Sequence, residues 1–253
     1  MKEFLLNPNF LIPFLSTVGA SLTIIILHSI HRYLNDRKKK LYTIAYMVDV
    51  SFRLLQTNLI LKKNTILPHI EAAKKMITGD QDLLIKTFLA DEFDILTDST
   101  IEFNHLPEEY KVLVGYDNIQ LLQAFETILY LNRNDKTRNN FNEFVKQNLK
   151  SENSFKNKNQ DEQIDILNTY WDYLDKIEHE TNIVIAFVLY LFLPSVREYI
   201  NRKYFLFCSK RNITTLLENA TELQKIFKDI VPKSNFIEKS AKGGIQKIIK
   251  QDI

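Results

Sequence analysis

The chain has 253 residues, a formal net charge of +2 at pH 7 and a single cysteine, Cys208. A charge so close to zero argues against a general nucleic-acid-binding protein, so we expect no specific nucleic-acid partner. One cysteine excludes an internal disulfide and a metal site of paired cysteines, and it fits a reducing cytosol. With only 5 glycines and 6 prolines, and apolar residues three to four apart over long stretches, the sequence predicts an all-α protein.

An apolar segment near the N-terminus predicts a membrane anchor. Residues 4–30 contain no Asp, Glu, Lys or Arg, and a helix needs about 20 predominantly apolar residues to cross the hydrocarbon core. We therefore expect a short external tail, residues 1–9, and a transmembrane helix over residues 10–31, followed by a cytosolic multi-helix bundle. Because the positive charges come after the apolar run, a cleavable signal peptide is not expected.

The residues after this segment set the predicted orientation. Residues 32–40 form a basic juxtamembrane segment, whereas the tail before the anchor has only Lys2 against Glu3. Lysine and arginine are enriched on the cytoplasmic side of membrane helices. The sequence therefore predicts a single-pass protein of the cytoplasmic membrane, embedded in the lipid bilayer with its C-terminal domain in the cytoplasm. The basic residues that carry this prediction are Arg32, Arg37, Lys38, Lys39 and Lys40.

Small side chains recur on the predicted anchor at a spacing that lets two helices approach closely. Ser16 and Ala20, and likewise Gly19 and Thr23, are four residues apart and share one face of a helix. This face predicts a helix–helix contact with a second copy of the chain or with a protein partner. The alternative is an ordinary lipid-facing helix.

Residues 41–149 are expected to form the first helical region of the bundle. An apolar stripe over residues 41–59 could continue the anchor helix across the basic segment, or could only pack into the core. Pro68 suits the first turn of a further helix that ends near residue 77. Asp117 and Gln120 form a predicted capping box for a helix with apolar residues over 121–129, and another helix is expected over residues 136–149.

Residues 150–163 are almost entirely polar and predict a linker or exposed loop, after which residues 164–253 predict a second helical region packed with the first. Within it, residues 183–193 are apolar throughout and end at Pro194. This run is too short to cross a bilayer, so we expect a buried core helix. The alternative is a membrane-embedded hairpin, which would place the following basic residues outside, against the usual charge distribution.

No residue pattern identifies a reaction or a cofactor. The side chains that could ligate a metal are Asp91, Asp94, His69, His105 and His179. Asp91 and Asp94 are three residues apart and could share a hard cation. The nearest acidic neighbours of His69 and His179 lie one or two residues away, however, rather than the three or four typical of metal sites on helices.

Basic residues alternate with aromatic ones over residues 197–211. This segment could form the basic outer face of a core helix, rest on an anionic membrane surface, or bind single-stranded nucleic acid by stacking and charge. Of the two functional interpretations we favour the membrane surface, because the anchor already holds the domain near lipid. No glycine-rich phosphate loop or nucleophile motif occurs, and Cys208 has apolar neighbours that keep a thiol inert. We therefore expect a protein-interaction or sensing module at the inner face of the membrane, without a cofactor. The alternatives are a membrane-perturbing effector that oligomerises through its anchor, and a metal-dependent enzyme.

Overall fold

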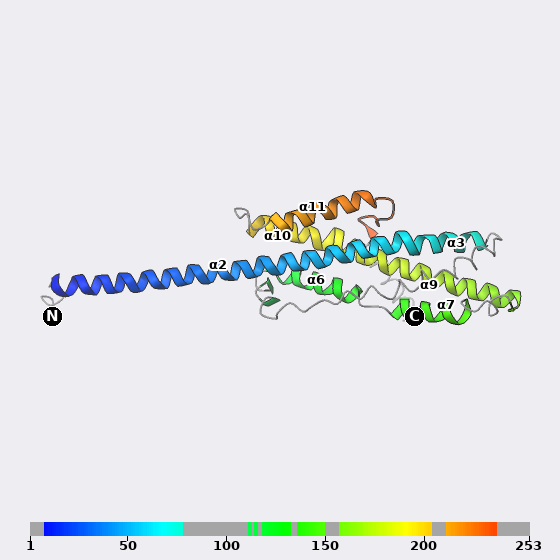
Figure 1. Cartoon of the computed structure of the whole chain (residues 1–253), viewed down its shortest axis with the longest axis horizontal. Coiled ribbons are helices and arrows are strands. Elements are labelled where there is room, and N and C mark those ends of the chain that lie inside the picture. The colour runs from blue at the N-terminus through cyan, green and yellow to red at the C-terminus, as the bar shows by residue number, and fades with distance from the viewer. Residues whose placement is uncertain are drawn as a thin grey trace, which may run out of the picture.

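The computed structural model describes residues 8–77, 111–112, 114–115, 118–132, 136–149, 157–203 and 211–236. Every regular element in these ranges is a helix, which confirms the predicted all-α class. The fold is organised around two long helical rods, and no loop interrupts either rod (Figure 1).

The first rod begins with α2 (Pro8–Leu61), continues through the π-helical turn η1 (Lys62–Ile66) and ends with α3 (Leu67–Ile77). At 1.5 Å per residue, α2 alone is about 80 Å long. Its N-terminal part extends beyond the other helices, which gather around its C-terminal part (Figure 1). Because the basic residues 32–40 do not interrupt α2, the apolar stripe over residues 41–59 continues directly from the predicted anchor.

The second rod consists of α9 (Gln160–Phe187), the π-helical turn η3 (Val188–Phe192) and α10 (Leu193–Lys203). It runs antiparallel to the first rod, so that α10 ends near the point where α2 enters the bundle (Figure 1). Among the described residues, three shorter helices pack against the rods. Of these, α6 (Ile119–Asn132) contacts both rods, α7 (Lys136–Asn148) contacts α9, and α11 (Arg211–Ile226) lies along α2.

In both rods the π-helical turn stands immediately before a Leu-Pro pair. The N–H of Leu67 and that of Leu193 each donate to the carbonyl five residues earlier. In an α-helix a proline ring clashes with the carbonyl four residues earlier, and a wider turn moves that carbonyl away. The second rod therefore passes Pro194 without ending, and the expected end of the helix there is wrong. Pro68 does lie in the first turn of α3, but α3 continues the first rod.

Two asparagine caps move helix starts away from their predicted positions. Asn159 Oδ1 accepts a hydrogen bond from the Glu162 N–H (2.9 Å) and Glu162 Oε2 accepts one from the Asn159 N–H (3.2 Å), a reciprocal capping box. It starts α9 at Gln160, inside the predicted linker 150–163. Asn118 Oδ1 accepts from the Leu121 N–H (3.1 Å) at the start of α6, while the predicted cap Asp117 lies outside the described residues.

The apolar side chains form two separate cores. The proximal core, nearer the N-terminal part of α2, joins α2 to α6, η3, α10 and α11, and contains Ile44, Val48, Phe125, Phe192 and Ile213. The distal core joins η1 and α3 to α7 and α9, and contains Ile66, Ile70, Phe141, Tyr170 and Leu174. Most of the apolar run over residues 183–193 is buried, as expected for a core helix. Its members in the proximal core are Ile185, Val188, Leu189, Phe192 and Leu193.

Candidate functional site

The N-terminal part of α2 exposes large apolar side chains on all sides. Ile24 is 66% exposed and Leu27 60%, and Ile25 and Ile26 between them are exposed as well. Successive residues of an α-helix point about 100° apart, so these four side chains cover the whole circumference. No described part of the chain therefore packs against α2 at this level.

The predicted helix–helix face lies on this exposed part of α2. Ser16, Gly19, Ala20 and Thr23 are all exposed, and the Thr23 hydroxyl donates to the Gly19 carbonyl oxygen (2.8 Å). A Cβ added at Gly19 would meet no atom within 4 Å. The face is thus open to a second helix, and contact with one stays a prediction.

The basic juxtamembrane residues lie where the exposed part of α2 meets the bundle. Arg32 and Lys38 are exposed, whereas Arg37, Lys39 and Lys40 are half-buried. Leu41 is the first buried residue of the proximal core. The basic segment is therefore the last stretch of α2 before the fold encloses it.

Within the described residues, the helical stretch that is long and apolar enough to cross a membrane is residues 160–202, not the N-terminal segment. It comprises α9, η3 and most of α10, and 56% of its most apolar window is buried inside the fold. Burial of this extent is typical of a core helix. The N-terminal anchor and the orientation predicted from residues 32–40 stay predictions.

A layer of buried polar side chains lies where the proximal and distal cores meet. We name as the polar layer the buried residues Asn58, Lys62, Asn132, Thr137, Arg138 and Thr181. Burying polar groups in a helical core costs free energy unless they are hydrogen-bonded, so such a layer requires specific partners. Those partners come from both rods, from α6 and α7, and from the chain after α11.

Lys62 is the buried cation of this layer. Its Nζ donates to Asn182 Oδ1 (2.7 Å) and to the Ile230 carbonyl oxygen (2.8 Å), and lies 3.3 Å from Glu178 Oε1. A lysine ammonium has three donors, and these three acceptors match them. The charge is thereby compensated although the side chain is only 7% exposed.

Residues 227–236, here called the C-terminal strap, cross both rods beside Lys62. Tyr190 donates a hydrogen bond to the Pro232 carbonyl oxygen (2.8 Å). Lys63 Nζ lies 5.4 Å from the centre of the Phe227 ring, and the rings of His179 and Phe236 are 5.4 Å apart. The strap is thus held to the first rod and to the second rod at separate points.

The other members of the layer join four helices. Asn58 Nδ2 donates to Asn132 Oδ1 (3.3 Å), and Asn58 Oδ1 accepts from Arg138 Nη2 (3.5 Å). Thr137 on α7 donates to Glu180 Oε1 on α9 (2.8 Å). Thr181 Oγ1 is the exception, because it is buried without a hydrogen-bond partner among the described residues. Such a network fixes the relative positions of the helices that it joins.

His69, one of the residues considered as a metal ligand, is buried in the distal region instead. Its Nδ1 lies 3.0 Å from the Tyr170 hydroxyl. Burial lowers the pKa of His69 from 6.5 to about 4, since desolvation disfavours the charged imidazolium. Burial raises the pKa of Tyr170 for the same reason. Both side chains are therefore uncharged at neutral pH, and a buried hydrogen bond joins the Tyr170 hydroxyl to Nδ1 of His69.

Of the remaining metal candidates, His179 is the one that lies among the described residues. His179 is exposed, and its ring contacts Phe236. Asp91, Asp94 and His105 lie outside the described residues, as does Cys208. Over the described ranges, no group of three or more His, Cys, Asp or Glu side chains could hold a metal ion.

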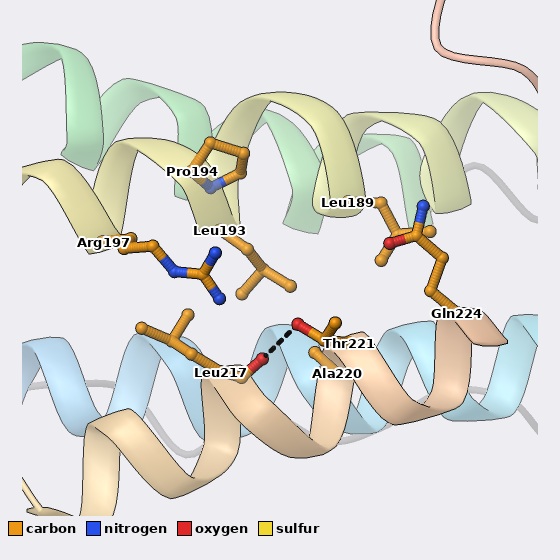
Figure 2. A pocket seen from close by; sticks show the side chains of 8 residues that line it. All are labelled: Leu189, Leu193, Pro194, Arg197, Leu217, Ala220, Thr221 and Gln224. Atoms are coloured by element: carbon orange, nitrogen blue, oxygen red, sulfur yellow. Dashed lines mark hydrogen bonds between the residues drawn. The ribbon is translucent and has the colours of Figure 1, made fainter.

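A groove of about 160 Å³ separates α10 from α11 (Figure 2). Leu189, Leu193 and Leu217 supply its apolar wall, Arg197 and Gln224 reach over it from opposite helices, and the Thr221 hydroxyl donates to the Leu217 carbonyl (3.0 Å). Pockets for small organic ligands usually have about 300–1,000 Å³. The groove is therefore too small for such a ligand.

Comparisons with known proteins give no relative: no family model, no curated protein and no solved structure matches this chain. The site is therefore assigned from its own geometry.

The polar layer was not predicted from the sequence, although its signal is present. Core positions on α2 follow a spacing of four and three residues through Ile44, Val48, Ser51 and Leu55. Asn58 and Lys62 continue this spacing. A polar residue at a position where the apolar spacing of the helix predicts a core residue indicates a buried polar network.

Proposed function

We propose that the chain is a single-pass protein of the cytoplasmic membrane whose helical bundle lies in the cytoplasm and binds a protein partner or transmits a signal there. The observation that carries the proposal is the exposure of Ile24, Ile25, Ile26 and Leu27 around the whole circumference of α2. In water such a helix is costly. In a bilayer each large apolar residue contributes about 0.3–0.6 kcal/mol to insertion.

The continuity of α2 supports a sensing role in particular. One uninterrupted helix contains the proposed anchor, the basic segment, Leu41 at the entry to the proximal core, and Asn58 in the polar layer. A tilt or rotation of the anchor would therefore reach Asn58 without passing through a flexible linker. Buried polar networks respond strongly to small displacements, because a lost partner leaves a buried polar group unsatisfied.

Membrane insertion is tested by alkaline carbonate extraction of membranes that contain the full-length protein. The wild-type chain should stay in the pellet. Leu22→Arg places a charge near the middle of the span and should shift the protein toward the soluble fraction, since it costs about 2.5–3.5 kcal/mol of insertion. Tyr130→Arg, at an exposed residue of α6, is the matched control and should not. Extraction of the wild-type chain would contradict the anchor.

Orientation is tested separately, in a Cys208→Ser chain that carries one new cysteine. Lys2→Cys should react with a membrane-impermeant maleimide on intact cells, and Ile164→Cys should react only after permeabilisation. Labelling of Ile164→Cys on intact cells would reverse the proposed topology. Label incorporation is read by mass spectrometry of the purified chain.

The partner is sought by affinity purification of the full-length protein in mild detergent. A stoichiometric protein or a second copy of the chain is expected to remain bound. Gly19→Leu, which fills the open space above Gly19, separates the two attachment modes. Loss of the partner in Gly19→Leu would place the contact on the anchor, and its retention would place the contact on the bundle.

A further inference from the structure

The end of the bundle nearest the exposed part of α2 carries basic and amphipathic side chains. Four exposed residues define this proximal rim: Lys38, Tyr42, Ile119 and Arg202. Lys38 and Tyr42 flank the start of the proximal core on α2. Arg202 belongs to the last turn of α10, which ends beside α2 in Figure 1. Ile119 begins α6, whose first turn lines a pocket together with Arg202.

The length of α2 sets how far this rim lies from the bilayer. If the span ends near residue 31, the rim residue Lys38 lies seven residues further along the helix, or about 10 Å, and Tyr42 lies eleven residues further, or about 16 Å. The headgroup layer of one leaflet is about 5–8 Å thick. No flexible linker separates the anchor from the bundle, so Lys38 stands just outside the headgroup layer, within reach of its long side chain. Attraction to anionic lipid is then needed to bring the rest of the rim into contact.

The charge of the rim matches an anionic surface. Lys38 is one of the basic residues of segment 32–40, and Arg202 of α10 adds to them. The acidic residues are Asp36 in that segment and Glu198 in α10. Arg202 and Glu198 form an ion pair of 2.6 Å with side chains that are 75% and 61% exposed. Exposed pairs of this kind are weak, so a lipid phosphate can replace the carboxylate. Tyr42 and Ile119 supply the apolar and aromatic contacts typical of a membrane interface.

From this geometry we propose that the proximal rim binds anionic phospholipid headgroups, so that the bundle stands end-on against the inner leaflet. The inference rests on the proposed anchor and adds to it a second contact with the membrane. Each basic residue near an anionic surface strengthens such a contact about fivefold. Loss of both Lys38 and Arg202 should weaken it by a factor of about 30.

The test uses the full-length Cys208→Ser protein with one fluorophore, at Ile119→Cys or at Ile164→Cys. Ile164 is also exposed, and it lies near the start of α9 at the far end of the second rod. The protein is reconstituted into vesicles of phosphatidylcholine, with or without phosphatidylglycerol, that contain a headgroup-spin-labelled lipid as quencher. We expect quenching at position 119 in the anionic vesicles only, its loss in Lys38→Gln/Arg202→Gln, and none at position 164.

The outcomes separate the two proposals. Carbonate-resistant protein without quenching at position 119 would overturn the rim contact and leave the anchor intact. Equal quenching in vesicles without phosphatidylglycerol would overturn recognition of anionic lipid. Quenching at both positions would overturn the end-on arrangement and indicate that the bundle lies flat on the membrane. Extraction of the protein by carbonate would contradict the proposed anchor, and with it the rim contact.

Discussion

Lys62 Nζ lies 2.8 Å from the carbonyl oxygen of Ile230, a residue 168 positions later in the chain. Through this bond the buried charge of the first rod holds the C-terminal strap. Because Asn182 and Glu178 of the second rod bind the same ammonium, one side chain joins three segments that are far apart in sequence.

Replacing this lysine tests how much the junction contributes. Lys62→Met keeps most of the volume and removes the charge, so Glu178 and the Ile230 carbonyl each lose a buried partner. We expect the free energy of unfolding to fall by about 3 kcal/mol, measured by urea denaturation of the full-length protein in detergent. Lys63→Met is the control: Lys63 is exposed above Phe227, and its loss should cost less than about 1 kcal/mol. Equal losses in the two variants would contradict a special role for Lys62.

Two threonines of the polar layer should respond in opposite directions to the same substitution. Thr181 is 0% exposed and its hydroxyl has no hydrogen-bond partner among the described residues, so Thr181→Val should raise the free energy of unfolding by up to about 1 kcal/mol. Thr137 donates to Glu180, so Thr137→Val should lower it by about 1–2 kcal/mol. Thermal denaturation compares the two variants. A destabilised Thr181→Val would show that its hydroxyl has a partner.

The pair of His69 and Tyr170 predicts acid sensitivity. In the unfolded chain a histidine titrates near pH 6.5, whereas burial holds the pKa of folded His69 at about 4. Between these pH values the unfolded state binds a proton that the folded state does not, so stability is unaffected above pH 6.5 and falls as the pH drops toward 4. At about 1.4 kcal/mol per pH unit, the total loss is about 3 kcal/mol.

The control for this effect is a chain without the titrating group. His69→Gln should flatten the loss of stability between pH 6.5 and 5, where few carboxylates titrate. His179→Gln, at an exposed histidine, should leave the loss unchanged. Urea midpoints measured at several pH values provide the comparison. If His69→Gln and the wild-type chain lose stability in parallel, another group is responsible.

The sequence predicted those parts of the fold that depend on local patterns. Apolar spacing identified α7 and the core stripe of α2, and the length of the apolar run over residues 183–193 identified a buried helix. Pro194 was misread because a proline usually ends a helix, and the π-helical turn that accommodates it has no pattern of its own.

The polar layer was missed for a different reason. Lys62 and Ile230 meet only after the rods have packed, and no local pattern pairs residues so far apart. The sequence could mark Lys62 as a polar residue at a core position, but not its partners. His69 was noticed as a chemical group, yet its partner Tyr170 lies 101 positions away. Side-chain type alone therefore suggested a metal ligand where the fold has a buried hydrogen bond.

The groove between α10 and α11 predicts where the fold tolerates added volume. Ala220 of α11 and Ala186 of α9 are both buried. Ala220 lines this groove (Figure 2), whereas Ala186 lines neither described pocket. Ala220→Leu should extend into the groove against Leu193 and raise the free energy of unfolding by up to about 1 kcal/mol, because it buries apolar surface without displacing neighbours. Ala186→Leu should instead lower it by about 1–3 kcal/mol through overpacking. Urea denaturation distinguishes them, and a destabilised Ala220→Leu would mean that α10 and α11 already fit as closely as the core.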